Sequence, residues 1–315
     1  MTSYTLIYNP EAGRKGASAV AEHMASRIKA AGHTALLQPT KAPGDATDLA
    51  FHAKSEVVVA IGGDGTINQV AGGLVKRRTP PRLGIIPQGT VNNLAKVLHI
   101  PLMPDLALVN LLEGTPHDLD IGIVNDRVMI STLTLGVLAN AAVSVSQKDK
   151  QRFGPIVYLT RGLNSLSRNQ HWHLKIAGNG TTWERNTSFL LVTMTNSVGG
   201  FRNFAPQAKP DDGLFHVFVA PKPTLGGFLL MLPYFLTGNF AKLPGMTYFA
   251  ADSLTIENKT PNTKLKSRID GDPSVGLPLR MQVISGKVQV LTKPVEPLGE
   301  KLGKLAQGTS PAPKA

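Results

Sequence analysis

The first part of the chain alternates short apolar runs with segments whose apolar residues recur at helical spacing. Residues 57–61 form an unbroken apolar run, which predicts a buried strand, and residues 67–74 follow it with a helical pattern. The same order recurs at residues 83–87 and at residues 6–8, and each of these runs is followed by a helical pattern of its own. Alternating strands and helices are typical of a parallel sheet with helices on both faces. The pattern therefore predicts an α/β N-terminal domain.

Beyond residue 125 the pattern changes to short runs rich in β-branched and aromatic residues, with turn residues between them. We expect strands at residues 128–130, 172–176, 189–192, 215–219, 254–256, 281–284 and 288–290, and one helix near residues 158–166. Short strands with turn signals between them are typical of a β-sandwich. The second part of the chain is therefore expected to form a β-sandwich.

Length and pattern together predict two domains and a tail. A chain of 315 residues can bury two separate cores. We expect an α/β domain over residues 1–125, rejoined by residues 290–300, and a β-sandwich domain over residues 126–290. From Pro294 onward the chain is rich in Pro, Gly and Lys without periodicity, which predicts a disordered tail over residues 301–315.

The three strand runs of the first domain each end in a turn of glycine and polar residues. These turns are Gly62-Gly63-Asp64-Gly65-Thr66, Gln88-Gly89-Thr90-Val91-Asn92-Asn93 and Asn9-Pro10-Glu11-Ala12-Gly13. Glycine permits positive φ and removes the Cβ atoms that would keep phosphate groups away from main-chain N–H groups. Because the carboxyl ends of parallel strands meet at one edge of a sheet, we expect the three turns to form a nucleotide site. The P-loop signature and the third glycine of the dinucleotide fingerprint are both absent from the sequence.

Asp64 is the acidic member of the clearest of these turns. A carboxylate in an anion-binding turn would repel phosphate unless a divalent cation lies between them or the carboxylate orients a donor. The alternative is a structural role, in which Asp64 caps the helix that follows a tight strand-to-helix turn. We expect Asp64 to take part in the chemistry.

Over nearly its whole length the chain resembles the bacterial diacylglycerol kinase family of lipid kinases. The nucleotide domain of that family is similar to those of sphingosine kinases and, more distantly, of NAD kinases and phosphofructokinases. The resemblance rests on Asn9-Pro10 with Gly13, Thr40 with Gly44-Asp45-Ala46, Gly62 to Thr66, Pro87 to Asn92, Asn196-Ser197-Val198-Gly199-Gly200, Pro206-x-Ala208 with Asp211-Asp212-Gly213, and Ile269-Asp270-Gly271-Asp272. The motifs of the second domain are the ones that separate the lipid kinases from NAD kinases.

The resemblance implies an ATP-dependent kinase of lipid metabolism that phosphorylates the hydroxyl of diacylglycerol or a related lipid alcohol. The residues it places at ATP are Asn9, Pro10, Glu11, Ala12, Gly13, Thr40, Gly63, Asp64, Gly65, Thr66, Ile67, Asn68, Gln69, Thr90 and Asn92. It places Asp64 beside the phosphates and their Mg²⁺, and Asp272 at the position of the general base that removes the proton of the lipid hydroxyl. Asp-Gly-Asp-Pro is also good chemistry for an ordinary hairpin turn.

The resemblance further implies a structural magnesium loop at Asp211, Asp212 and Leu214, where carboxylates and a backbone carbonyl would hold the ion. Two acidic residues before a glycine also fit a simple β-turn. The sequence therefore leaves both interpretations of this loop open.

Three positions depart from the family pattern. The family usually has glutamate at the positions of Gln69 and Asp272, and aspartate at that of Asn93. Asp272 keeps the charge with a shorter reach, whereas Gln69 and Asn93 lose the charge. Two alternatives to a lipid kinase follow from the sequence: a nucleotide- or lipid-binding relative with weakened catalysis, and an NAD kinase.

Charge and composition favour a membrane partner. The chain has 33 Lys and Arg against 21 Asp and Glu, a net charge of +12, which suits an anionic surface. No basic stripe with interleaved aromatic residues is present, so we expect peripheral contact with an anionic membrane and no nucleic acid.

The longest apolar run, residues 228–236, is too short to span a bilayer. We expect it to form a partly buried helix, and the alternative is a surface that enters the membrane interface. The absence of cysteine and the early first strand predict a cytoplasmic protein at the inner face of the cell membrane. The sequence leaves a homodimer open.

Overall fold

The computed structural model describes residues 1–11, 16–136, 171–198, 204–220, 234, 237–263 and 265–293. The helix expected near residues 158–166 and the tail expected over residues 301–315 lie outside the described residues. The same holds for the apolar run 228–236, apart from Tyr234.

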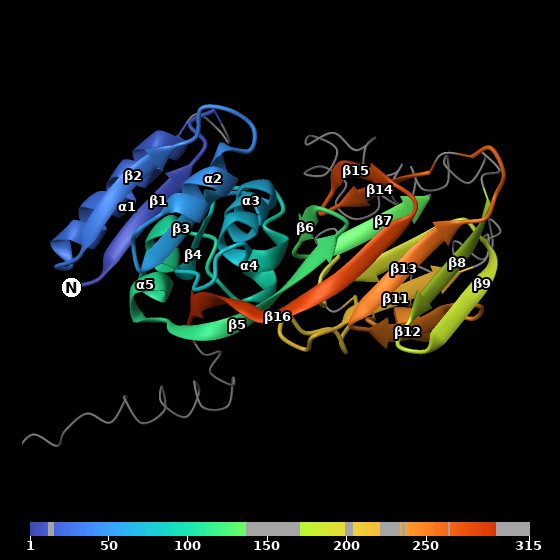
Figure 1. The fold of residues 1–315 in the computed structure, drawn as a ribbon. Helices are drawn as coiled ribbons and strands as arrows, with labels where there is room; N and C mark the ends of the chain where they lie inside the picture. Colours follow the sequence, from blue (N-terminus) through green and yellow to red (C-terminus); the bar gives the residue numbers. More distant parts are fainter. Residues whose placement is uncertain are drawn as a thin grey trace, which may run out of the picture.

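The N-terminal domain is built on four parallel strands in the order β2-β1-β3-β4 (Figure 1). The strands are β1 (Ser3–Tyr8), β2 (Thr34–Pro39), β3 (Val57–Gly62) and β4 (Arg82–Pro87), and the helices are α1 (Ala17–Ala30), α2 (Asp45–His52), α3 (Asp64–Val75), α4 (Asn93–Val97) and α5 (Pro104–Glu113). Every residue of β3 is buried, as its unbroken apolar run predicts. The expected parallel α/β domain is confirmed.

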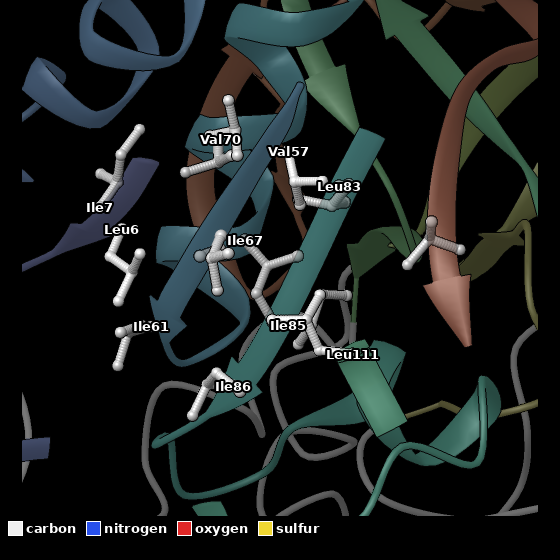
Figure 2. Close-up of a cluster of buried hydrophobic side chains, with 14 of the residues drawn as sticks. Leu6, Ile7, Val57, Ile61, Ile67, Val70, Leu83, Ile85, Ile86 and Leu111 are labelled. Carbon is white, nitrogen blue, oxygen red and sulfur yellow. The ribbon is translucent and has the colours of Figure 1, made fainter. Parts of the chain in front are cut away.

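Helix α3 packs its apolar side chains into the core of this domain. Figure 2 shows Ile67 and Val70 of α3 among the side chains of the neighbouring strands, including Val57 and Leu83. All four side chains are almost fully buried, with exposed fractions of 1% or less. Burial of such side chains fixes the helix on the sheet, and with it the turn at which the helix begins.

The second domain is a β-sandwich, as the short strand pattern predicts. One sheet runs in the order β12-β11-β10-β7-β14-β15. The other is the antiparallel part, made of β16, β13, β8, β9, β5 and β6, of a ten-stranded sheet that continues through β4 into the N-terminal domain. The strands are β5 (Thr115–Val124), β6 (Arg127–Met129), β7 (Thr132–Gly136), β8 (Trp172–Gly178), β9 (Thr181–Thr187), β10 (Phe189–Thr193), β11 (Phe215–Ala220), β12 (Thr247–Ala251), β13 (Ser253–Asn258), β14 (Lys266–Ile269), β15 (Asp272–Gly276) and β16 (Leu279–Thr292), with a short 3₁₀ helix at Phe240–Lys242.

Strand β16 runs through both domains (Figure 1). In the sandwich, Gln282 pairs with Ser253 of β13, and near the other end Val290 pairs in parallel with Leu83 of β4. The pairing of β16 with β5 shifts in register between Ile284 and Val288. The two runs predicted at residues 281–284 and 288–290 are therefore one long strand with an irregularity between them.

Candidate active site

The three predicted turns lie at one edge of the N-terminal sheet. Strands β1, β3 and β4 are neighbours and run parallel, so their carboxyl ends meet. The N–H of Gln88 donates to the carbonyl of Gly62 at 2.8 Å, and the N–H of Thr40 donates to that of Tyr8 at 2.9 Å. The edge of the sheet therefore brings together the turns that follow β1, β3 and β4, together with Thr40.

Two glycines of the clearest turn, Gly62 and Gly63, are closely packed. A Cβ added at Gly63 would lie 3.0 Å from the Cα of Gly89, and one added at Gly62 would lie 2.4 Å from the Thr66 hydroxyl oxygen. At Gly65 an added Cβ would have no neighbour within 4 Å, so this exposed residue leaves open space. None of these three glycines has a positive φ, so the turn does not use that freedom of glycine. Glycine instead lets two turns touch each other.

The first turn of α3 presents main-chain N–H groups without a side-chain cap. Gly63 is the N-cap residue, in extended backbone, and no side chain caps the helix. The first N–H groups of a helix have no intrahelical partner, and the helix dipole favours an anion there. This end of α3 can therefore receive a phosphate group.

Asp64 is the first residue of α3 and contacts the next turn along the sheet. Its Oδ1 atom accepts the N–H of Leu94, in the first turn of α4, at 3.3 Å. The structural alternative is wrong as stated, because Gly63 and not Asp64 is the N-cap residue of α3. Asp64 instead accepts an N–H group at the start of the neighbouring helix. The carboxylate is only partly buried.

Asn92 and Asn9 use their side chains to shape their turns. The Oδ1 atom of Asn92 accepts the N–H of Gly89 and its Nδ2 atom donates to the Gly89 carbonyl, both at 2.9 Å. Asn9 Oδ1 accepts the N–H of Glu11 at 2.9 Å, an Asx-type turn. Ala12 and Gly13 lie outside the described residues.

Ile67 and Thr90 differ in their exposure. The side chain of Ile67 is fully buried in the core, and its N–H donates to the Gly63 carbonyl at 3.1 Å. Ile67 therefore holds the turn in place through the core and does not present its side chain to a ligand. Thr90 is exposed, and Pro10 and Thr66 are partly buried.

A cleft of about 240 Å³ lies between α3 and the sandwich. Its lining residues come from α2, α3, β6 and the β14–β15 hairpin: Thr47, Gly65, Asn68, Gln69, Gly72, Lys76, Asp126, Arg127, Val128, Ile269, Asp270, Asp272, Pro273 and Ser274. The cleft thus brings Gly65 of the predicted nucleotide turn close to Asp272, the predicted base, although the two residues are far apart in the sequence. Asp64 is not among the lining residues and lies next to Gly65.

Asp272 is the first residue of β15, which forms a hairpin with β14. It follows a two-residue turn, Asp270-Gly271, with φ values of 50° and 93°. Positive φ at both central residues is the geometry for which hairpins select Asp-Gly. The hairpin interpretation is therefore confirmed, and the exposed Asp272 side chain still lines the cleft.

Asp270 is a site residue that sequence reasoning missed. Burial raises the pKa of Asp270 to about 6, against the opposing effect of hydrogen bonds from the N–H groups of residues 130–132 and from Asn68. Its partners lie far away in the sequence, so no local pattern could have indicated them.

The Asp211-Asp212 loop is held by groups of the protein. Asp212 Oδ1 accepts the N–H of Leu214 at 3.0 Å, and Oδ2 lies 2.8 Å from the N–H of Lys209 and 2.9 Å from Nε2 of His216. Burial acts to raise the pKa of Asp212, but these hydrogen bonds outweigh it and hold that pKa below its usual value.

The described part of the chain contains no group of three or more His, Asp or Glu placed to hold a metal ion. Magnesium at Asp211, Asp212 and Leu214 therefore stays a prediction, and we assign no step to it.

Comparisons with known proteins agree with this architecture. The sequence profile of the diacylglycerol kinase catalytic domain matches residues 3–124, and that of the YegS C-terminal NAD kinase beta sandwich-like domain matches residues 131–292. The chain is 31% identical over 276 residues to the diacylglycerol kinases of Staphylococcus aureus strains bovine RF122 / ET3-1 and MRSA252, with 87% of each chain covered.

Solved structures show the same fold. A crystal structure of a diacylglycerol kinase from Bacillus anthracis str. Sterne aligns with a TM-score of 0.71 at 22% identity, covering 93% of this chain and 97% of that one. Another structure from the same organism aligns with a TM-score of 0.77 at 23% identity, covering 93% and 96%.

These findings define the protein as a kinase, a phosphotransferase with a nucleotide-binding domain and a β-sandwich domain. It is similar to lipid kinases over most of its length. The chain belongs to the bacterial diacylglycerol kinase family.

Proposed function

We propose that the protein is an ATP-dependent lipid kinase that phosphorylates the hydroxyl of diacylglycerol or a related lipid alcohol. The observation that carries this proposal is the cleft in which Gly65, Asn68 and Gln69 of α3 face Asp272 of β15. A phosphate donor at the start of α3 and an acceptor hydroxyl beside Asp272 would share this space. The names of the relatives at 31% identity support a diacylglycerol acceptor.

Different residues would bind the phosphates, remove the proton of the acceptor and hold the metal ion. The N-terminal end of α3 and its uncapped N–H groups hold the phosphates by charge and hydrogen bonding. Asp272 accepts the proton of the lipid hydroxyl while the hydroxyl oxygen bonds to the γ-phosphorus of ATP. The bond between the γ-phosphorus and the bridging oxygen breaks, and that oxygen leaves with ADP. Asp64 is the carboxylate of the turn suited to hold Mg²⁺, which when bound neutralises phosphate charge.

Transfer of the γ-phosphate of ATP to diacylglycerol in mixed micelles is the expected activity. Labelled ATP should give labelled phosphatidic acid in proportion to enzyme, while NAD offered as acceptor should remain unlabelled. ATP binding without transfer to diacylglycerol or any other lipid alcohol would instead support the weakened relative. Transfer to NAD in place of lipid would support the NAD kinase alternative.

We propose peripheral contact with an anionic membrane, since the acceptor lies there and the net charge is +12. Within the described residues, no helix has the length and apolar character needed to cross a bilayer. Binding to phosphatidylglycerol-containing vesicles, measured by co-sedimentation, should weaken as salt rises, because charges are screened beyond roughly 10 Å at 0.1 M ionic strength. Equal binding to neutral and anionic vesicles, or binding to neither, would show the idea to be wrong.

A further inference from the structure

Asp270 begins the turn between β14 and β15, and its carboxylate is bound by two other parts of the chain. Its Oδ1 atom accepts the N–H groups of Ser131 and Thr132, each at 2.8 Å. Its Oδ2 atom accepts the N–H of Ile130 at 2.8 Å and the side-chain amide of Asn68 at 2.6 Å. A carboxylate that accepts this many N–H groups is held in one position.

The main chain fixes the same turn to the start of β7. The N–H of Asp270 donates to the carbonyl of Thr132 at 2.8 Å, and Ile269 pairs with Leu133. Asp270 has a φ of 50°, which is uncommon for a residue other than glycine. Because the turn is fixed in this way, Asp272 at its far end is fixed with it.

Asn68 connects this turn to the helix that begins at the nucleotide turn. Its Nδ2 atom donates both to Asp270 and to the carbonyl of Val128, the latter at 3.1 Å. Asn68 lies in α3, one helical turn after Asp64. Asn68, Asp270 and Asp272 line the same cleft.

We propose that Asp270 is a positioning residue for phosphoryl transfer, which through Asn68 sets the distance between Asp272 and a nucleotide at the start of α3. This inference rests on the kinase function proposed above. Phosphoryl transfer depends mainly on positioning, and a misplacement of about 1 Å can lower a rate by about a hundredfold. Direct contact between Asn68 and ATP, which the family resemblance implies, would have a different kinetic signature, because its loss weakens ATP binding.

The substitution Asn68→Ala is expected to lower kcat about tenfold or more, because the hairpin loses its connection to α3. ATP binding, measured separately by calorimetry, should change less than about twofold. Asp270→Asn keeps the side-chain volume but replaces one acceptor oxygen with a donor, so it should lower kcat in the same way. A raised Kd for ATP with unchanged kcat would overturn the inference in favour of direct contact.

Asn258→Ala is the matched control. The Asn258 side chain, like that of Asn68, makes two hydrogen bonds: it accepts the N–H of Thr260 at 3.0 Å and donates to the carbonyl of Thr263 at 2.8 Å. Asn258 is not among the residues that line the cleft. Its substitution should therefore leave kcat unchanged even if it lowers the melting temperature.

A double-mutant cycle with Asp272 separates positioning from a general loss of structure. If Asn68 acts through Asp272, Asn68→Ala should add little to the loss already caused by Asp272→Ala. The same fractional loss of kcat in both backgrounds would overturn the inference while leaving the kinase function standing. If Asn68→Ala does not fold, Asp270→Asn takes its place in the cycle. A wild-type protein without transfer to any lipid alcohol would overturn both proposals.

Discussion

Asp64→Asn should remove most of the kinase turnover while the fold stays intact. The substitution is isosteric, and the amide Oδ1 can still accept the N–H of Leu94, which the carboxylate accepts at 3.3 Å. It removes the negative charge that would hold Mg²⁺ beside the phosphates, so we expect kcat to fall on the order of a hundredfold or more. The measurement is lipid phosphorylation at saturating ATP, with the melting temperature recorded for both proteins.

Asp64→Ala separates the charge from the hydrogen bond. This variant loses both, so its turnover should match that of Asp64→Asn. Its free energy of unfolding should be lower than that of Asp64→Asn by about 1 kcal/mol, the typical effect of losing a capping side chain. An Asp64→Asn protein with unaltered turnover would remove Asp64 from the chemistry. Only its contact with α4 would then remain as its role.

Asp272→Ala should lower turnover by about a hundredfold or more with little effect on ATP affinity, as expected for loss of a general base. Asp272 is exposed at the first position of β15, so the hairpin turn formed by Asp270 and Gly271 should survive the change. Turnover with diacylglycerol and ATP binding by calorimetry are measured for each variant.

Asp272→Glu tests the same assignment in the opposite direction. Glutamate keeps the carboxylate and extends its reach by one methylene group, so the variant should be far milder than Asp272→Ala. Asp252→Ala is the matched control, because Asp252 is also an exposed acid beside a strand of the sandwich and is not a lining residue of the cleft. Equal rates for wild type and Asp272→Ala would contradict the assignment.

The sequence predicted strands with a continuous apolar run, such as β3, and strands with regular alternation of buried and less buried residues, such as β8. Strand β3 reads as one apolar run because both of its faces are buried, and β10 does so for the same reason. Strand β9 was missed because it lies at the edge of its sheet and is mostly polar, with Trp183 and Thr187 as its buried residues. An edge strand has a weaker hydrophobic pattern, so whether it forms a strand depends more on its pairing with the neighbouring strand than on its own sequence.

The sequence predicted those parts of the candidate site that are encoded by local motifs, and it did not predict contacts between distant segments. The turn after β3 and the acid at residue 272 have recognisable local patterns, and the structure brings Gly65 and Asp272 to one cleft. The packing of Gly63 on Gly89 and the bond between Asn68 and Asp270 join segments that are distant in the sequence. Such contacts depend on how the domains fold together, and no periodicity or spacing in the chain carries that information.

Strand β16 completes the sheet of the N-terminal domain with a segment from the second half of the chain. Its C-terminal part lies beside β4, where Val290 pairs with Leu83. A fragment that ended near residue 125 would leave β4 as an open sheet edge whose residues 83–87 are all buried in the whole protein. Exposed apolar edges recruit other chains by strand pairing, so such a fragment should aggregate. The nucleotide domain, although it comes first in the sequence, can close its sheet only after the end of the sandwich has been synthesised.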